Sequence, residues 1–544
     1  MPSFRNLRWR YLFKEKKPSP DLVKKYGKFL AQLLVNRDLS EPPGRKPVPA
    51  HLKELEKAFN TIERYIKNNS YILVFGDYDV DGLTSTALFY NLLKEIGAKR
   101  VIPIVPERTE GYGLSPEIVK KFANYTEGKG LIVALDNGTK EVKTVELAKK
   151  LGLEVVIFDH HTPGDTVPDA VIVNPKLHKK APQYLKDLST VGLVFLFGLF
   201  LEKKGFELNA KRFLDLVALG TVADVSPLSE LNFKLVREGL KLLSQKRSSS
   251  LGLLHMVERF YNKAPFSEND LAFKFVPRLN AFGRMDSARL GLKFLLTSQR
   301  ETAKRLYEEM ENLNFHRRRL TQQLTQKIVR KFRGKAPKGI VYASREIKKG
   351  VSGIIAGRLT SMWGVPSVVF ASDGEVAVGS ARSPQGLNIV KILEKLSPLL
   401  ERWGGHSQAA GLSVKVEKLE EFKEAFLQEV QKVSWEPPEI GIDFPIEPTK
   451  FKEMPQLLEL LKILEPYGSG NPYPTFVFED ILTDFVRTPY GYKLSFKRNG
   501  SYYMNLDEDK TIPTTLKGKK VRVVYTVRNI DRFDLTVEDF QVVN

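Results

Sequence analysis

Short apolar runs alternate with longer helical stretches between about residues 70 and 225. The runs that fit buried strands are Tyr71–Phe75, Leu131–Leu135 and Glu154–Phe158. Helical stretches such as Thr84–Ile96 and Lys140–Leu151 separate them. Strands that alternate with helices are typical of a parallel α/β sheet. The pattern therefore predicts a parallel-sheet domain in this part of the chain.

Each of the three predicted strands ends at an acidic residue. Asp77 follows the first strand, Asp136 the second and Asp159 the third. In open α/β sheets the ligand site lies at the carboxyl ends of the strands. We therefore expect these three carboxylates to meet at one site.

A long helix is predicted after this domain. No Gly or Pro occurs between Gly291 and Gly334, and apolar residues recur at alternating spacings of four and three. Residues 312–340 contain nine Lys/Arg and no Asp/Glu. Such a run is usually a solvated helix face, and phosphate contact is the equal alternative given the charge of the whole chain.

The remaining sequence predicts two further domains. A second α/β stretch covers residues 338–432 and contains the Gly-rich segment GGHSQAAG, and SWEPPE marks a connection after it. Five short alternating runs then follow from about Pro474 to Asn544, with Asn499-Gly500 as a hairpin signal between two of them. About five strands in about 70 residues suit a small barrel of the OB type.

Aromatic and basic residues are interleaved in this last region. The aromatic residues are Tyr492, Phe496, Tyr502 and Tyr503, and the cations among them are Lys493, Lys497 and Arg498. Aromatic rings that stack on bases and cations that contact phosphates form a single-strand-binding surface. The alternative, that half of the rings fill the barrel, stays open at this stage.

Composition and charge narrow the class of protein. The 544 residues include 85 Lys+Arg and 64 Asp+Glu, a net charge of +21, which favours a polyanionic partner such as nucleic acid. Because the chain has no Cys, a disulfide scaffold, a Cys-ligated metal and a thiol nucleophile are excluded. The longest apolar run, Val191 to Leu201, is about half of the roughly 20 residues that span a bilayer. We expect a soluble cytoplasmic protein.

The sharpest local motif is DYDVDG, with Asp77, Asp79 and Asp81 at alternate positions after a strand. A calcium-binding loop of the D-x-D-x-D-G kind has Glu at its twelfth position and follows a helix. This chain has Leu88 at that position and the motif follows a strand, so both features argue against a calcium loop. An exposed strand end is the simpler alternative for the motif taken alone. The other acidic motifs of the chain favour a functional site over an exposed strand end.

Further acids and two adjacent histidines recur after apolar runs. Asp136 lies in LDNG, Asp159, His160 and His161 form DHH, and Asp224 lies in LGTVADVSPL. We expect all of them at strand ends, where they offer enough ligands for two divalent ions. Two such ions promote hydrolysis of phosphate esters. The chain contains no GxxxxGK[ST] loop, which excludes P-loop chemistry.

These motifs carry a resemblance. DYDVDG, LDNG, DHH and VADV, in this order and spacing, are similar to the four motifs of the DHH phosphoesterase superfamily, and GGHSQAAG resembles the signature of its DHH-associated domain. More specifically, residues 70–480 resemble the RecJ family of bacterial single-stranded-DNA-specific 5′→3′ exonucleases. Segments such as LKDLSTVG, PRLNAFGRM, VGSARS and LEPYGSGNPYP share this likeness.

The resemblance implies a site for two manganese or magnesium ions. The residues implied as metal ligands are Asp77, Asp79, Asp81, Asp136, His160 and Asp224. Asp136 is the candidate bridge between the ions. Asp159 would orient the histidine pair, since carboxylates commonly fix imidazole ligands. His161 would face the scissile phosphate, with a structural role as the alternative.

The resemblance also implies residues that hold the DNA. The residues expected to bind its phosphates are Arg108, Arg278, Arg284, Ser380, Arg382 and His406. Arginine suits this role because its planar fork binds phosphate oxygens in pairs. Any of the arginines could instead form an interdomain salt bridge. Gly404 and Gly405 would form a DNA-binding loop that lets the substrate approach the backbone.

The predicted fold is an α/β multidomain protein. Its expected parts are an N-terminal basic and helical region (1–69), a DHH catalytic domain with a parallel sheet (70–290), a long connecting helix (291–336), an α/β DHH-associated domain (337–433), a connecting region (434–473) and an OB-type nucleic-acid-binding barrel (474–544).

The function that the resemblance implies is a processive exonuclease specific for single-stranded DNA. It would thread DNA through a cleft between the DHH and DHH-associated domains and release 5′ mononucleotides in DNA repair and recombination. The alternatives are a DHH-family oligoribonuclease or nucleotide phosphatase and a non-catalytic DNA-binding protein of the replisome. Expected partners are single-stranded DNA, a single-strand-binding protein and a helicase, with no membrane.

Overall fold

The structure, a computed structural model, describes residues 3–44, 52–108, 110–111, 113–261, 264–332, 337–488, 491–506, 511–530 and 533–543. The chain folds into two compact units. The parallel-sheet unit contains Pro42–Phe315 and Leu464–Pro472. The mixed-sheet unit contains Met1–Glu41, His316–Ile463 and Tyr473–Asn544.

The parallel-sheet unit is built on a five-stranded sheet in the order β3-β2-β4-β5-β6, and every paired strand is parallel to its neighbour. The strands are β2 (Ile72–Phe75), β3 (Val101–Ile104), β4 (Leu131–Leu135), β5 (Glu154–Phe158) and β6 (Val171–Val173). The three predicted strands are confirmed, the first of them one residue shorter. The strand order reverses between β2 and β4, and ligand sites of open α/β sheets lie at such a reversal.

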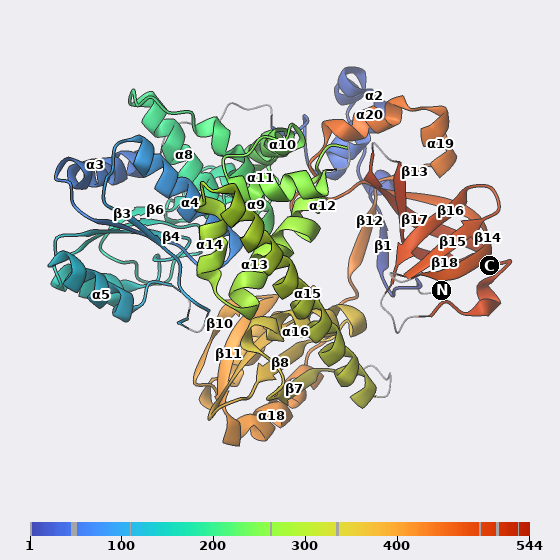
Figure 1. Cartoon of the computed structure of the whole chain (residues 1–544). Coiled ribbons are helices and arrows are strands. Elements are labelled where there is room, and N and C mark those ends of the chain that lie inside the picture. The colour runs from blue at the N-terminus through green and yellow to red at the C-terminus, as the bar shows by residue number, and fades with distance from the viewer. Residues whose placement is uncertain are drawn as a thin grey trace. The chain divides into compact units, whose positions relative to one another are not determined.

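Helices cover both faces of this sheet, because alternate strand residues point to opposite sides. Val74 and Val133 pack in one core with helices α3, α4 and α8, whereas Leu73 and Ile132 pack in another with α5 and α6. Figure 1 shows α5 and α8 on opposite sides of the strands. These helices are α3 (Lys53–Lys67), α4 (Val80–Glu95), α5 (Pro116–Thr126), α6 (Val142–Lys150) and α8 (Thr190–Lys203).

Further helices complete the unit. They are α7 (Gln183–Lys186), α9 (Leu214–Ala223), α10 (Glu230–Ser244), α11 (Leu251–Phe260), α12 (Glu268–Asp270), α13 (Val276–Met285) and α14 (Ala288–Leu296). The prediction that Asp224 follows a strand is wrong, because the apolar run before it is α9. Residues 214–221 of this helix are all buried. An apolar run of this length on all sides fits a buried helix as well as a strand.

The predicted helix between Gly291 and Gly334 is interrupted. Helix α14 ends at Leu296, and α15 (Arg300–Lys331) begins after a three-residue break. The Thr297 hydroxyl accepts a hydrogen bond from the Gln299 N–H (3.2 Å), and Thr297 has an extended backbone. Ser and Thr side chains that bond nearby backbone groups compete with helix continuation, and this explains the break.

The DHH-associated region, which lies in the mixed-sheet unit, is an α/β fold as predicted. Its five-stranded sheet has the order β10-β11-β9-β8-β7, with only β7 and β8 parallel. Its elements are β7 (Ile340–Ser344), α16 (Lys349–Trp363), β8 (Ser367–Ala371), β9 (Val376–Arg382), α17 (Ile389–Lys395), β10 (Arg402–His406), β11 (Ala409–Lys415) and α18 (Leu419–Gln431). Phe370, Phe422 and Phe426 lie in its core.

The C-terminal sheet has the order β13-β14-β15-β16-β18-β17, and β17 also pairs with β14. Its strands are β13 (Phe444–Pro445), β14 (Thr475–Thr488), β15 (Gly491–Phe496), β16 (Gly500–Asn505), β17 (Lys520–Asn529) and β18 (Asp534–Val542). The five predicted strands and the hairpin at Asn499-Gly500 are confirmed. Asp480 accepts backbone hydrogen bonds from Arg498 (2.9 Å) and Asn499 (3.0 Å), which fixes this hairpin.

The N-terminal region is helical as predicted, but residues 1–69 do not stay together. Strand β1 (Arg8–Tyr11) pairs with β12 (Glu439–Ile442) in the mixed-sheet unit, whereas α3 belongs to the parallel-sheet unit. The other elements of these two regions are α1 (Leu12–Glu15), α2 (Pro20–Asn36), α19 (Pro448–Glu453) and α20 (Gln456–Ile463). None of the helices in the described part of the chain is long and apolar enough to cross a membrane.

Candidate metal and phosphate site

The DYDVDG segment leads from β2 directly into α4. Asp79 is the N-cap of α4, and its Oδ1 accepts a hydrogen bond from the Gly82 N–H (3.1 Å). An acidic N-cap satisfies a free N–H and is favoured by the helix dipole. Asp77 and Asp81 are buried on either side of Asp79. The motif therefore presents three carboxylates within one strand-to-helix turn.

Gly82 allows this turn to close. A Cβ built on Gly82 would lie 2.4 Å from the carbonyl oxygen of Asp77 and 2.5 Å from its backbone nitrogen. Because both neighbours are backbone atoms, they cannot rotate away as a side chain would. The glycine of the motif is therefore required by the close approach of α4 to the chain that carries Asp77.

Gly82→Ala is expected to lower the free energy of unfolding by about 1–3 kcal/mol, the usual cost of overpacking a buried position. Gly357→Ala is the matched control, because a Cβ there meets nothing within 4 Å in helix α16. Replacing glycine by alanine inside a helix stabilises by about 0.5–1 kcal/mol. Urea denaturation of both variants measures the difference, and equal effects would contradict this role of Gly82.

Asp136 lies directly after β4 with a φ of +64°, a left-handed conformation that few non-glycine residues adopt. It is buried, and its Oδ1 accepts a hydrogen bond from the Thr190 hydroxyl (3.0 Å). The backbone N–H groups of Thr190 and Val191, at the start of α8, donate to Asp81 at 2.8 and 3.0 Å. The first turn of α8 thus holds two of the carboxylates in place.

The DHH segment follows β5. Asp159 is buried and accepts hydrogen bonds from His161 Nδ1 (2.7 Å), the His161 N–H (3.1 Å) and the Thr139 N–H (3.1 Å). The rings of His160 and His161 lie 4.6 Å apart between centroids. The side chain of His160 is only 12% exposed and that of His161 is 41% exposed. His161 is therefore the histidine of this pair that is more open to a ligand.

Asp224 follows α9 and completes the arrangement. Its Oδ1 lies 3.7 Å from His160 Nε2, and its Oδ2 accepts a hydrogen bond from the Ser226 hydroxyl (2.5 Å). The same His160 nitrogen lies 3.4 Å from Asp136 Oδ1. The loops after β2, β4 and β5 and the end of α9 therefore converge, as predicted for the three strand ends.

Three overlapping groups of these side chains have ligand atoms within 4.8 Å of one another, a spacing that suits a metal ion. The groups are Asp77, Asp79 and Asp136; Asp81, His160 and Asp224; and Asp136, His160 and His161. Within the described residues, Asp77 Oδ1 and His160 Nε2 are buried and have no hydrogen-bond partner. Buried polar atoms normally have partners. A carboxylate oxygen and an imidazole nitrogen that are buried without a hydrogen-bond partner fit a site for Mn²⁺ or Mg²⁺.

The electrostatics of the site agree with this fit. Burial raises the pKa of Asp77, Asp81 and Asp136 well above the usual range, and neighbouring carboxylates raise it further. Burial would also raise the pKa of Asp159, but the hydrogen bonds and charge of His161 outweigh it and hold that pKa below its usual value. The ionised form of these three carboxylates is thus disfavoured unless a cation binds among them, whereas the ionised form of Asp159 is favoured.

The pKa values of His160 and His161 shift in opposite directions. Burial lowers the pKa of His160, which favours the neutral imidazole that binds metals. Burial also acts to lower the pKa of His161, but the hydrogen bond and charge of Asp159 outweigh it and leave that pKa raised. The neutral form is thus favoured for His160 and the protonated form for His161.

Three of the predicted arginines lie in the parallel-sheet unit. The guanidinium of Arg108 lies 4.2 Å from the centre of the Tyr78 ring, and its Nε donates to the Gly283 carbonyl (3.2 Å). Charges of Arg108 and Arg284 both act on Tyr78, which lies between Asp77 and Asp79. Arg278 instead forms an ion pair with Glu311 (2.5 Å). Arg108 and Arg284 are thus placed beside the carboxylates, and Arg278 has an acidic partner.

The other predicted residues lie in the mixed-sheet unit, around β9, β10 and β11. Ser380 shares a hydrogen bond with Ser352 (3.1 Å), and Arg382 is the last residue of β9. Burial lowers the pKa of Arg382, and this cation has no acidic partner among the described residues. His406 is exposed at the end of β10. Arg382 is therefore a partly buried cation available to an anion.

The two glycines of the predicted DNA-binding loop lie next to His406. Gly404 and Gly405 are in β10 and pair with Gly411 and Ala410 of β11. A Cβ on Gly404 would meet nothing within 4 Å, so this face of the hairpin is open. A Cβ on Gly405 would lie 2.3 Å from the Ala409 carbonyl oxygen, so the hairpin itself requires that glycine.

Sequence reasoning missed three residues of this arrangement. Thr190 holds Asp81 and Asp136, Tyr78 supports Arg108, and Glu107 accepts hydrogen bonds from the Ser287 hydroxyl (2.5 Å) and the Ala288 N–H (3.1 Å). Glu107 thereby ties the loop with Arg108 to the start of α14. The one available signal was that all three lie inside segments that resemble the family: Tyr78 in DYDVDG, Glu107 in ERTEGYGL (107–114) and Thr190 in LKDLSTVG.

Comparison with known proteins gives a consistent picture. The model described as "DHH family, N-terminal domain" matches residues 71–221, and that of the DHHA1 domain matches residues 337–432. The single-stranded-DNA-specific exonuclease RecJ of Escherichia coli (strain K12) is 35% identical over 458 residues, which cover 78% of each chain.

Two solved structures are similar to this chain over 99% of its length. The crystal structure of RecJ in complex with Mn²⁺ from Thermus thermophilus has a TM-score of 0.85 at 28% identity, covering 99% of this chain and 80% of that chain. The Mg²⁺ complex of RecJ from the same organism has a TM-score of 0.77 at 26% identity, with 99% and 79% covered. The chain belongs to the RecJ family of single-stranded-DNA-specific exonucleases.

Proposed function

We propose that this protein is a metal-dependent exonuclease that degrades single-stranded DNA from the 5′ end and releases 5′ mononucleotides. The observation that carries the proposal is the convergence of five aspartates and two histidines, from three strand ends and a helix end, on ligand distances suited to metal ions. The RecJ relatives named above, which are single-stranded-DNA-specific exonucleases, support the substrate. A role in DNA repair and recombination follows from that substrate.

The proposed metal ligands are Asp77, Asp79, Asp81, Asp136, His160 and Asp224. Asp136 and His160 each belong to two of the three ligand groups. Only the carboxylate of Asp136 has two oxygens to offer, which supports its assignment as the candidate bridge between two Mn²⁺ or Mg²⁺ ions. When bound, two such ions would supply a water nucleophile at neutral pH and offset the charge that develops on the phosphate. The chain itself fixes the ligands through the hydrogen bonds of Thr190, Val191 and Ser226.

His161 is proposed to contact the scissile phosphate. Its side chain is the more exposed of the pair, and the contact of its Nδ1 with Asp159 orients the ring, so Nε2 is the nitrogen proposed to donate to a phosphate oxygen. The hydrogen bond and charge of Asp159 raise the pKa of His161, which favours the protonated ring. Asp159 is therefore proposed as the residue that orients and charges His161.

In the parallel-sheet unit, Arg108 and Arg284 are proposed to bind DNA phosphates. In the mixed-sheet unit, the same role is proposed for Ser380, Arg382 and His406, and Gly404 and Gly405 precede His406 in β10. Arg108 is held by Tyr78 and Gly283, so its remaining N–H groups are presented in a fixed direction. A preoriented guanidinium loses little freedom when it binds phosphate. Arg278 remains a predicted phosphate contact that would have to share its charge with Glu311.

Arg382→Ala is expected to raise the KM for single-stranded DNA by about 10–100-fold, the effect of losing one charge-assisted contact of about 1.5–3 kcal/mol. Arg382→Lys should recover part of the loss, since it restores the charge without the planar fork. Arg402→Ala is the control, because Arg402 is exposed in β10 of the same sheet. Steady-state kinetics measure all three, and equal KM values for both alanine variants would contradict the role.

The C-terminal sheet is proposed to be an OB-type barrel that holds the downstream strand. Pairing runs β14-β15-β16-β18-β17 and returns to β14, which closes the sheet. Tyr492 and Phe496 are buried, so they are proposed to fill the barrel, whereas Tyr503 is 54% exposed beside the exposed Lys493. Tyr503 is therefore the proposed stacking residue of this domain.

We propose domain boundaries at residues 69, 290, 336, 433 and 473. A single-strand-binding protein and a helicase also remain predicted partners, and we place the activity in the cytoplasm, where DNA is repaired.

The basic part of α15, with Arg318, Arg319 and Arg330, is proposed to contribute phosphate contacts. Binding to DNA should then weaken as salt increases.

The test compares 5′- and 3′-labelled single-stranded oligonucleotides with Mn²⁺ or Mg²⁺. Immediate release of mononucleotides from the 5′ label is the expected result. Binding without cleavage under either ion would favour the non-catalytic replisome protein, and preference for RNA of two to five nucleotides would favour the oligoribonuclease. Blunt duplex should resist cleavage relative to a duplex with a 5′ overhang.

A further inference from the structure

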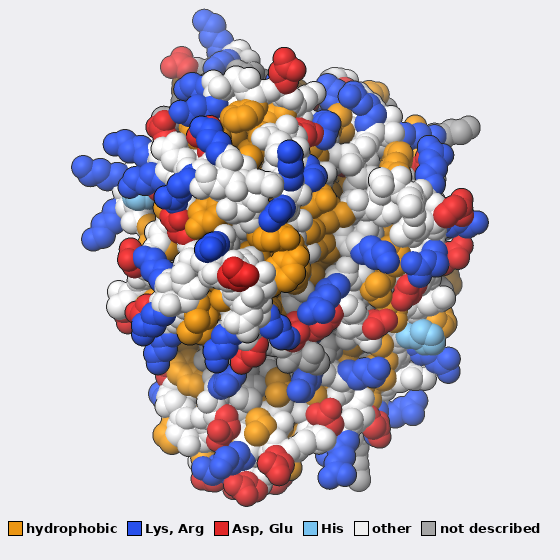
Figure 2. Space-filling model, turned by 60° about the vertical axis from the view of Figure 1, so that its left-hand side comes forward, with side chains coloured by type: hydrophobic (Ala, Val, Ile, Leu, Met, Phe, Trp, Pro, Cys, Tyr) orange, Lys and Arg blue, Asp and Glu red, His pale blue; other side chains and the backbone are white. Residues whose placement is uncertain are grey.

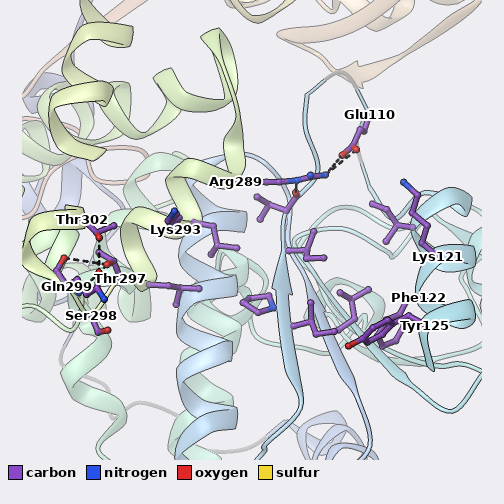
Figure 3. A pocket seen from close by; sticks show the side chains of 18 residues that line it. Glu110, Lys121, Phe122, Tyr125, Arg289, Lys293, Thr297, Ser298, Gln299 and Thr302 are labelled. Atoms are coloured by element: carbon purple, nitrogen blue, oxygen red, sulfur yellow. Dashed lines mark hydrogen bonds and ion pairs between the residues drawn. The ribbon is translucent and has the colours of Figure 1, made fainter. Parts of the chain in front are cut away.

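An open groove lies along β3, the edge strand of the parallel sheet. It has a volume of about 890 Å³ and is formed by β3, helix α5, helix α14 and the turn between α14 and α15. Ligand pockets are typically about 300–1,000 Å³, so the groove has the size of a binding site. Figure 3 shows its walls, with Lys121 and Tyr125 on one side and Lys293 and Thr297 on the other.

The groove exists because β3 is incompletely covered. All four residues of β3 are only half-buried, whereas all four residues of its neighbour β2 are buried. Ile102 and Ile104 face the core on the α5 side of the sheet and also line the groove. An apolar floor of this kind is continuous with the core and is uncovered within the described part of the chain.

The free edge of β3 does not suit the addition of another strand. The carbonyls of Arg100 and Ile104 accept hydrogen bonds from the N–H groups of Ile72 in β2 and Gly76 just after it. In a parallel pair every second residue points its backbone groups at the neighbouring strand, and the residues between point to the free edge. Pro103 therefore faces that edge and has no N–H to offer. The carbonyl of Val105 already accepts a hydrogen bond from Arg289 Nε (3.4 Å). Proline on an edge strand blocks strand pairing, so an occupant must bind through side chains.

The rim of the groove is positively charged. Lys121 on α5 and Lys293 on α14 both line it, and neither has an acidic partner among the described residues. The one acidic residue of the lining, Glu110, is held by Arg289 at 3.2 Å. Figure 2 shows Lys and Arg side chains around the hydrophobic areas of one face of the molecule, with Asp and Glu side chains among them. The unpaired charge at the groove is therefore +2, from the two lysines.

We propose that this groove is a docking site for a short acidic segment of a partner protein, which inserts large apolar side chains against Ile102 and Ile104 and places carboxylates on Lys121 and Lys293. Charge complementarity and the aliphatic floor together favour this occupant, since a neutral hydrophobe leaves both lysines unused. Single-stranded nucleic acid, whose bases can stack on Tyr125 of the lining, is the alternative that the oligonucleotide measurement below distinguishes. The proposal goes beyond the exonuclease activity and does not rest on it.

The groove is also joined to the loop that carries Arg108. Arg289 lies at one end of the groove and contacts Glu107 (3.4 Å), Glu110 and the Val105 carbonyl. A carboxylate in the groove would compete with these two glutamates for Arg289. For this reason Arg289 is left unchanged in the test, and the two lysines, which have no such contacts, are substituted.

The test uses the full-length protein and a fluorescein-labelled hexapeptide, Glu-Asp-Leu-Glu-Phe-Glu, followed by fluorescence anisotropy at low salt. Lys121→Glu combined with Lys293→Glu should weaken binding at least about tenfold, since two attractive contacts become repulsive. Lys120→Glu combined with Lys143→Glu is the control, because both lysines are exposed on α5 and α6 and do not line the groove. A peptide with Ser in place of Leu and Phe should also lose at least about tenfold in affinity.

Four results would overturn the proposal. One is the absence of saturable binding of the acidic peptide up to 1 mM (about −4 kcal/mol), and another is equal loss in both double variants. A greater loss of affinity for an oligonucleotide in the groove variant than in the control would assign the groove to DNA. A dimer, found by light scattering, that Leu296→Glu alone disrupts would assign the groove to a second copy of the chain. Thermal unfolding confirms that each variant is folded.

Discussion

Asp136→Asn is expected to lower the rate of single-stranded DNA hydrolysis by about a thousandfold or more while the protein stays folded. Asp136 has ligand atoms in two of the three candidate metal groups, so its loss affects both ion positions. An amide has the same shape but lacks the negative charge that a divalent ion requires. Losing several kcal/mol of metal-dependent stabilisation of the transition state corresponds to this factor, at about 1.4 kcal/mol for each tenfold change.

Single-turnover release of mononucleotides from 5′-labelled DNA measures this effect. The substitution keeps the Thr190 hydrogen bond, because the side-chain oxygen that accepts it is retained. Asp169→Asn is the matched control, since Asp169 is almost fully exposed and pairs only with Lys149 among the described residues. A rate within tenfold of the wild type for Asp136→Asn would show that the catalytic ions lie elsewhere.

The strand ends could be predicted from the sequence because two local signals agree there. Asp77, Asp136 and Asp159 each follow a run of apolar residues that is buried on both faces, and parallel strands bring their carboxyl ends to one edge. The hairpin at Asn499-Gly500 was predictable for a similar reason, since its turn residues determine its geometry. Local sequence patterns were sufficient to predict these features because residues close in the sequence determine them.

Asp224 and Thr190 show where local patterns are insufficient. An apolar run that is buried on all sides has the same appearance in a strand and in a helix, so the position of Asp224 after α9 could not be read from the sequence. Thr190 is an ordinary helix residue until α8 packs against α4 and brings it to Asp81 and Asp136. Only the tertiary contact gives Thr190 its role.

Pairings between segments far apart in the sequence could not be predicted either. Strand β1 pairs with β12 across more than four hundred residues, and no pattern in either segment specifies the other. The ion pair of Arg278 with Glu311 likewise joins α13 to α15 after a break in the predicted long helix. A family motif marks Arg278 as important, but it does not state which acid lies beside it.

Without metal ions, the protein is expected to lose stability as the pH rises from 5 to 8. Burial and like charges raise the pKa of Asp77, Asp81 and Asp136 in the folded state above their unfolded values. The folded state then binds protons more tightly than the unfolded state. This stability is fully present below about pH 4, the ordinary pKa of Asp, and is lost as the pH rises through the raised values. Each unit of raised pKa corresponds to about 1.4 kcal/mol.

Other groups of the site change this slope in known directions. His161, whose pKa is raised, loses stability with rising pH in the same way as the aspartates. His160, whose pKa is lowered, acts in the opposite direction around its unfolded pKa of about 6.5. The lowered pKa of Asp159 matters only below about pH 4. The aspartates, three in number, are expected to dominate between pH 5 and 8.

Thermal unfolding in EDTA and in Mn²⁺ across this pH range tests the expectation. In EDTA the Tm should fall with pH, and Mn²⁺ should raise the Tm most at pH 8, where the ligand carboxylates are charged and an ion binds the folded state best. Asp136→Asn removes one of the repelling charges, so its Tm in EDTA at pH 8 should exceed that of the wild type, although its activity is lost. A variant with lower Tm and an unchanged response to Mn²⁺ would show that Asp136 serves the fold rather than the ions. The same carboxylate is thus expected to cost stability in the metal-free protein because it is placed for metal binding, a trade-off that ordinary core residues do not show.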